Sequence, residues 1–163
     1  MNDRDFGLTR RRFLTAAAAV SVALGTSGCE QQEEKTEAVG SSRHIGDHLD
    51  LMRKLGMVAG IGAHKNETVE GTVKAGLKPD FYMKTINRLG YFAAEPDRTA
   101  EMMSAIDVPW IAFKILGAGR IKPEEGFAYA LNAGADFLCV GMFEFQVEGN
   151  VQLARKLMSE MPG

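Results

Sequence analysis

Four short apolar runs alternate along the chain with longer stretches in which apolar and polar positions mix at helical spacing. The runs cover residues 57–63, 80–86, 110–116 and 136–142, and continuous apolar runs of this length are typical of buried parallel strands. Their starts lie roughly 23 to 30 residues apart, which is about the length of one strand–helix unit. This alternation predicts an α/β fold in which helices cover a parallel sheet.

Helix signals fill the spaces around these runs. A helix at 46–55 is predicted before the first strand, and a helix at 151–161, capped by Asn150, after the last. Pro123 begins the helix after the third strand, with acidic side chains near the positive end of its dipole. Glycines stand where the other helices are expected to end: Gly56, Gly76 and Gly134.

Two architectures have this element order, a doubly wound open sheet and part of a (β/α)₈ barrel. The even spacing, and the lysine and histidine side chains near strand ends, favour the barrel. A folded domain at 44–163 holds four units, which is half of a barrel of ~250 residues. Either two copies pair as a homodimer to complete it, or the chain is a shortened relative of a full-length protein. An open half would expose two sheet edges, so we expect self-association or low stability.

Residues 1–29 read as an export signal. Arg11 and Arg12 precede Phe-Leu and an alanine-rich apolar run at 15–25, the pattern of a twin-arginine signal peptide. The small residues before Cys29 resemble a lipoprotein box, which predicts a lipid anchor at that cysteine. Residues 30–43 are polar and acidic and are expected to form a disordered tether. The predicted location is therefore the periplasm or cell envelope.

The charge and the cysteine content of the chain limit the classes of partner and of covalent cross-link that can be expected. The chain has 19 basic and 21 acidic side chains and no basic cluster in the folded part, which argues against nucleic acid. Of the two cysteines, Cys29 belongs to the signal, so no intramolecular disulfide framework is possible in the folded part. Cys139 lies in an apolar run and is expected to be a small buried hydrophobe.

Side-chain alternation gives candidate catalytic residues. With the four apolar runs aligned, His64, Lys84 and Lys114 fall on one face, toward the C-terminal ends of three strands. In a barrel that face is the interior. Burial and like charge lower a lysine pKa, and a neutral lysine can form a Schiff base with a carbonyl substrate. The alternative is that the lysines point outward or pair with acids.

His64 and the nearby acids allow other roles. His64 follows a strand and is either a general acid/base, a metal ligand or a hydrogen-bonded structural residue. Glu144 follows the last strand and either lines the site or leads into the final helix. With Glu67 they are too few for a convincing zinc or manganese site, so neither a metal nor another cofactor is expected.

Two stretches resemble a known family. Asp80-Phe81-Tyr82-Met83-Lys84-Thr85 and Phe113-Lys114-Ile115-Leu116-Gly117-Ala118-Gly119-Arg120 resemble the lysine strands of Schiff-base deoxyribose-phosphate aldolases, which are (β/α)₈ barrels. The resemblance implies that Lys84 forms the Schiff base and that Lys114 lowers its pKa. It also implies that Gly117 and Arg120 help to hold a phosphate. Gly119, Asn87 and Glu144 are further candidates for contact with the substrate. The stretch also resembles exported bacterial barrel proteins to which no activity is attached.

Two functions are left open. The first is an exported, barrel-like Schiff-base lyase that acts on a small carbonyl or sugar-like substrate. The second is a non-catalytic barrel remnant or ligand-binding domain.

Overall fold

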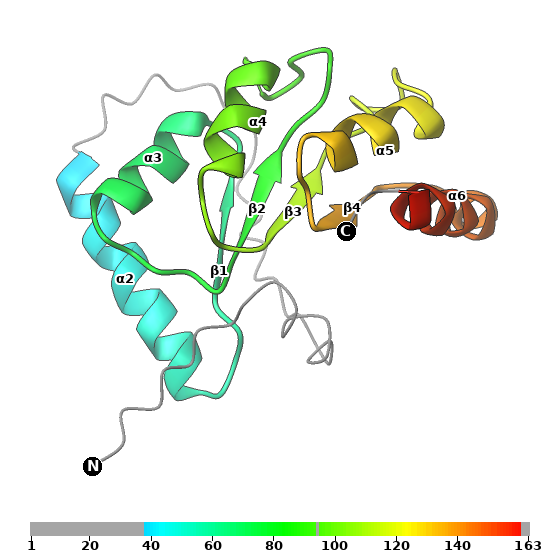
Figure 1. Cartoon of the computed structure of the whole chain (residues 1–163). Coiled ribbons are helices and arrows are strands. Elements are labelled where there is room, and N and C mark those ends of the chain that lie inside the picture. The colour runs from blue at the N-terminus through cyan, green and yellow to red at the C-terminus, as the bar shows by residue number, and fades with distance from the viewer. Residues whose placement is uncertain (1–37, 94, 161–163) are drawn as a thin grey trace.

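The sheet is parallel and open. A computed structural model describes residues 38–93 and 95–160, and in them four parallel strands lie in the order β1-β2-β3-β4 (Figure 1). The strands are shorter than the apolar runs that predicted them: β1 (Gly60–Ala63), β2 (Phe81–Thr85), β3 (Trp110–Phe113) and β4 (Phe137–Cys139). The predicted α/β fold is confirmed, and four parallel strand–helix units are consistent with a partial barrel that is not closed.

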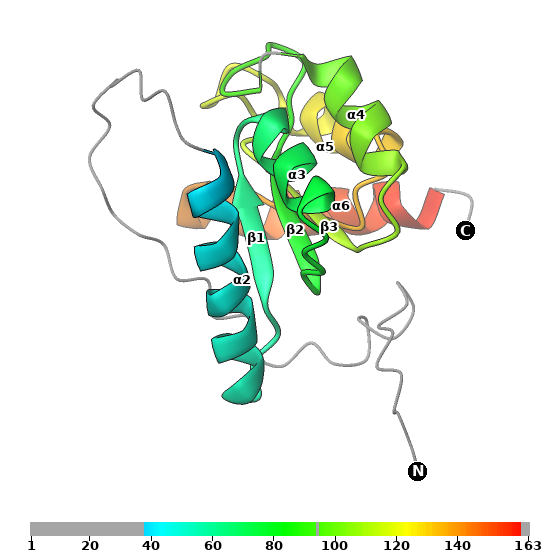
Figure 2. The same cartoon turned by 90° about the vertical axis from the view of Figure 1, so that its left-hand side faces the viewer.

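Helices connect the strands and flank the sheet. They are α2 (Ala38–Lys54), α3 (Asn66–Lys74), α4 (Pro96–Ser104), α5 (Pro123–Asn132) and α6 (Val147–Glu160), with the short 3₁₀ helix η1 (Glu144–Gln146) before α6. Figure 1 shows α2 beside β1 at one end of the sheet and α6 beyond β4 at the other, and Figure 2 views the β1 end. None of the described helices is both long and apolar enough to cross a membrane.

Both terminal helices begin earlier than the sequence pattern predicts. The backbone of α2 is helical from Ala38, inside the segment 30–43 that was expected to be a disordered tether. Asn150 lies within α6 rather than capping it; the side chain is buried, and its Nδ2 donates to Met142 Sδ at 3.4 Å. The predicted signal peptide and the predicted lipid site at Cys29 lie outside the described residues.

The strand register corrects the predicted faces. Gly62 pairs with Met83 and Ala63 with Lys84, so β1 is shifted by one residue from the expected alignment. Lys84 shares its face with Tyr82 and Ala112, and these three side chains are fully buried with apolar residues of the helices. The face predicted to be the barrel interior is therefore the face that the helices cover.

The opposite face of the sheet is less covered. It carries Gly62, Met83, Ile111, Phe113 and Cys139, which are half-buried or exposed, and also Phe81 and Thr85, which are buried. The expectation that Cys139 is buried was wrong, because it ends the edge strand β4 on this open face as an exposed free thiol. In the described part of the chain, a partly exposed face and a sheet that is not closed are consistent with the predicted half barrel.

Two aspartates join neighbouring strands in the same way. Asp80 precedes β2, and its Oδ2 accepts the backbone N–H of Ala59 at 2.7 Å. Asp136 precedes β4, and its Oδ2 accepts the N–H of Trp110 at 3.0 Å. Each carboxylate thus accepts a backbone N–H at the start of the preceding strand. This contact fixes the position of one strand along the axis of its neighbour.

Candidate functional site

The C-terminal edge of the sheet gathers polar and aromatic side chains from three successive units. His64 follows β1, and its Nδ1 lies 2.6 Å from Oγ1 of Thr85, the last residue of β2. Thr85 is fully buried while His64 is exposed. The hydroxyl therefore fixes the imidazole from below and leaves its outer edge open to solvent.

Two phenylalanines hold the imidazole between them. The His64 ring centroid lies 5.2 Å from that of Phe113, at the end of β3, and 5.3 Å from that of Phe92, in the loop after β2. Both ring pairs are tilted, at 34° and 44°. These contacts set the plane of the imidazole, and the rings exclude water from its sides.

Residues with a strained, left-handed backbone conformation also lie at this edge of the sheet. Among the described residues, three that are not glycine have a positive φ: Phe92 (56°), Lys114 (58°) and Ala118 (60°). All three lie in loops at this edge, and the Lys114 Nζ stands 4.0 Å from the centre of the Phe92 ring. A left-handed conformation costs a residue with a Cβ roughly 1–3 kcal/mol, and such strain clusters at functional sites. Because Lys114 has left the extended conformation, strand alternation does not determine its direction.

Lys84 lies beneath the site instead of in it. Its Nζ donates to the backbone oxygens of His64 at 2.7 Å and of Thr85 at 3.0 Å, and the side chain is fully buried. Burial lowers the Lys84 pKa from 10.5 to about 8, and the nearby Glu67 carboxylate opposes this shift. The structure thus has a lysine whose pKa is lowered, and the cause is burial. The aldolase resemblance had implied a different cause, the charge of Lys114.

His64 lies in a partly buried position near two lysines. Burial lowers its pKa below the usual 6.5, and Lys114 and Lys84 lower it further. The imidazole is therefore neutral at pH 7, with one nitrogen able to donate and the other able to accept. Such a group can move a proton or hydrogen-bond a carbonyl or hydroxyl oxygen.

Asn87 shapes the loop after β2. Its Oδ1 accepts the Tyr91 N–H at 2.9 Å, and its Nδ2 donates to the Tyr91 oxygen at 2.7 Å. The side chain is fully buried. Asn87, a candidate for contact with the substrate, thus closes the turn that leads to Tyr91 and Phe92.

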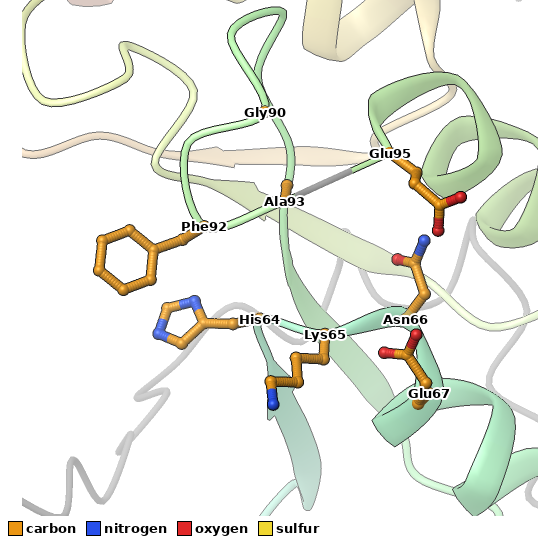
Figure 3. A pocket seen from close by; sticks show the side chains of 8 residues that line it. All are labelled: His64, Lys65, Asn66, Glu67, Gly90, Phe92, Ala93 and Glu95. Carbon is orange, nitrogen blue, oxygen red and sulfur yellow. The ribbon is translucent and has the colours of Figure 1, made fainter. Parts of the chain in front are cut away.

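Two pockets open at this edge. The smaller, about 420 Å³, is lined by His64 and Phe92 together with polar side chains of the next loops and helices. Figure 3 shows the two rings on one side of it, and Asn66, Glu67 and Glu95 on the other. Asn66 is held there by Thr99, whose Oγ1 donates to its Oδ1 at 2.9 Å.

The larger pocket, about 890 Å³, lies over the ends of β3 and β4. Lys114, Gly119 and Arg120 line it together with Tyr91. The Lys114 Nζ is 5.8 Å and the Arg120 Cζ 5.2 Å from the Tyr91 ring centre. Among the lining residues, Gln146 comes from η1, whereas Glu144 of η1 and Gly117 do not line either pocket.

Four side chains of the site were not predicted from the sequence: Thr85, Tyr91, Phe92 and Phe113. Thr85 and Phe113 share the face opposite Lys84, as the alignment of β2 and β3 predicted, but that face was taken to be the outside of the barrel. Tyr91 and Phe92 could have been found as a pair of aromatic residues after Gly90, in the loop that follows a strand. Aromatic side chains in such a loop are candidates for ligand contact.

In the described part of the chain, no three histidine, cysteine, aspartate or glutamate side chains come together as a possible metal site. Comparisons with protein-family models, with curated proteins and with solved structures found no match for the chain. The family resemblance therefore rests on the two lysine motifs alone and stays a prediction.

Proposed function

We propose that the protein binds a small anionic molecule with carbonyl or sugar-like oxygens at the C-terminal edge of its sheet. Lys114 and Arg120 take the anionic group, Tyr91 and Phe92 form the apolar wall, and His64 hydrogen-bonds a carbonyl or hydroxyl oxygen. Keto acids and phosphorylated or oxidised sugars belong to this class.

The observation that supports this most is that two cations line one pocket and lie beside one aromatic ring. Within the described residues, Arg53, Arg88 and Arg98 form ion pairs with aspartate or glutamate, whereas Arg120 and the lysines, Lys114 among them, form none. Cations that are held near each other without a counter-charge favour an anion between them.

Calorimetric titration of the full chain tests the proposal, with pyruvate as a keto-acid probe and inorganic phosphate as an anion without a carbonyl. Lys114→Gln and Arg120→Gln should each weaken the binding of either probe by tenfold or more, since each removes a charge-assisted contact. Lys74→Gln removes an exposed lysine of α3 far from both pockets and should bind as the wild type does. Equal affinities in all four proteins would refute the site.

A second candidate is the Schiff-base lyase that the lysine motifs suggest, and the lowered pKa of Lys84 favours it. In the neutral lysine, two N–H bonds point to the His64 and Thr85 oxygens, and the remaining lone pair is the nucleophile. It would attack the carbonyl carbon, water would leave, and an imine would remain. Because the amine is buried under the His64 backbone, the loop at His64 has to open first.

Borohydride reduction in the presence of pyruvate separates the two candidates. A reduced adduct that peptide mapping places on Lys84, and that is absent from Lys84→Met, supports the lyase. No adduct, or adducts spread over surface lysines, leaves anion binding alone as the function.

We also propose, from the sequence pattern, that the protein is exported by the twin-arginine route and lipid-anchored at Cys29. Replacing Arg11 and Arg12 by lysine keeps the charge, so a loss of export would come from the loss of the arginine pair itself. Fractionation of cells that express the two forms tests this. Equal amounts in the envelope would contradict the proposed route.

A further inference from the structure

The smaller pocket at the C-terminal edge of the sheet is separate from the pocket that Lys114 and Arg120 line. The two pockets have no lining residue in common. The smaller one measures about 420 Å³ and lies between the loop after β1, with the start of α3, and the loop that joins β2 to α4. A cavity of this size has room for one small ligand of its own.

The charged side chains that line this pocket balance one another. Lys65 and Glu67 contribute one charge of each sign. The Glu95 carboxylate is paired with Arg98, whose Nη1 lies 2.7 Å from its Oε2. Arg98 also pairs with Glu70, which does not line the pocket. Because an ionic ligand that leaves water needs a counter-charge, a lining without an excess of either charge favours an uncharged ligand.

Asn66 brings unused hydrogen-bonding capacity to the pocket. It begins α3 and is only 7% exposed. Its Oδ1 accepts from Thr99, and its Nδ2 makes no hydrogen bond among the described residues. Every fully buried side-chain nitrogen and oxygen in that part of the chain has a partner, so this Nδ2 reaches open space, and Figure 3 shows it on the side of Glu95. A buried amide with free N–H donors favours a ligand that offers oxygen acceptors.

Two rings form the opposite wall of the pocket. Phe92 and His64 lie across from the amide and the two carboxylates in Figure 3, with their ring centroids 5.3 Å apart. The imidazole is neutral at pH 7, because burial and the two nearby lysines hold the pKa of His64 below 6.5. A sugar ring has the matching chemistry: its C–H faces pack on aromatic carbon, and the hydroxyls at its rim both donate and accept.

We propose that the smaller pocket binds an uncharged monosaccharide ring. One face of the ring packs on Phe92, and its hydroxyls donate to the Glu67 carboxylate and accept from the Asn66 amide. The His64 Nε2, on the far side of the imidazole from the Thr85 hydroxyl, hydrogen-bonds a further hydroxyl. This site goes beyond the proposed anion site and does not depend on it, since an uncharged ligand needs no cation.

Ligand-observed NMR titration of the full chain at pH 7 tests the inference, with D-glucose, D-galactose, D-mannose and D-xylose as probes. At least one of these sugars should bind saturably. Cyclohexanol has a six-membered ring and a single hydroxyl, so it can pack on the rings but leaves most of the polar groups unpaired. It should bind at least tenfold more weakly than the best sugar. Cyclohexanol binding as tight as that of the sugars would reveal an apolar cavity only and would overturn the proposal.

Two substitutions locate the sugar site, and a third is the matched control. Glu67→Ala removes a carboxylate acceptor, and Phe92→Leu removes the flat ring but keeps an apolar side chain. Each should weaken the binding of the best sugar fivefold or more, while near-UV circular dichroism stays unchanged. Glu101→Ala removes a glutamate from an exposed position of α4 that lines neither pocket, and it should bind as the wild type does. No saturable binding of any of the four sugars, or equal affinities in the wild type and all three variants, would overturn the proposal.

Discussion

Replacing Lys84 by methionine should remove a rise in stability with pH. At pH 7 Lys84 is protonated in both the folded and the unfolded chain, and the folded state bears the cost of a charge that is fully buried. As pH rises above 8 the folded state loses this proton while the unfolded state keeps it up to about 10.5. The free energy of unfolding therefore rises with pH in this window.

The pKa sets the size of this effect. A lowering from 10.5 to about 8 corresponds to about 3 kcal/mol at full titration, and to about 2 kcal/mol between pH 7 and pH 9.5. Measurement should stop near pH 9.5, since burial raises the Tyr82 pKa and so makes stability fall at higher pH. The difference between wild type and variant cancels the other titrating groups.

Urea unfolding at several pH values measures the free energy of unfolding of the wild type and the variant. Trp110 is the single tryptophan and is fully buried, so its emission reports the loss of the sheet. Lys84→Met should lose the rise of about 2 kcal/mol between pH 7 and pH 9.5, whereas Lys74→Met, at an exposed position on α3, should keep the wild-type slope. An equal slope in wild type and Lys84→Met would refute the assignment of the titrating group.

Three further substitutions test other contacts by the same assay. Asp80→Ala leaves the Ala59 N–H without its carboxylate and should cost about 1–3 kcal/mol, whereas Asp80→Asn, which keeps an oxygen acceptor, should cost less; equal losses would contradict the contact. Thr85→Val removes the hydroxyl beside His64 and should cost about 1 kcal/mol, and Thr85→Ser should restore most of it. Gly126→Ala places a methyl group 2.8 Å from the Ile115 oxygen and should cost about 1–3 kcal/mol by overpacking α5 against the loop after β3; an unchanged midpoint would show that the loop yields.

The order and type of the elements could be predicted because several local signals agree. Each apolar run is followed by polar helical spacing, and glycines stand at the helix ends, where Gly56, Gly76 and Gly134 do have positive φ values. Pro123 begins α5 as expected. Such signals depend only on neighbouring residues, so one sequence is enough to read them.

The direction of the side chains could not be predicted in the same way. The first apolar run begins at Met57, but β1 begins at Gly60, and its pairing is one residue out of the expected alignment. A slip of one residue exchanges the two faces of a strand, and this is why His64, after β1, was expected on the same face as Lys84. The left-handed conformation of Lys114 depends on the packing of the whole loop, and nothing in the lysine itself favours it.

The most direct test of the proposed ligand site is the pyruvate titration of wild type and Lys114→Gln at pH 7, with Lys74→Gln as the matched control. Saturable binding to wild type and Lys74→Gln, weakened tenfold or more in Lys114→Gln, is the result predicted by two cations that line one pocket. Binding that is the same in all three proteins, or absent from all three, would contradict it.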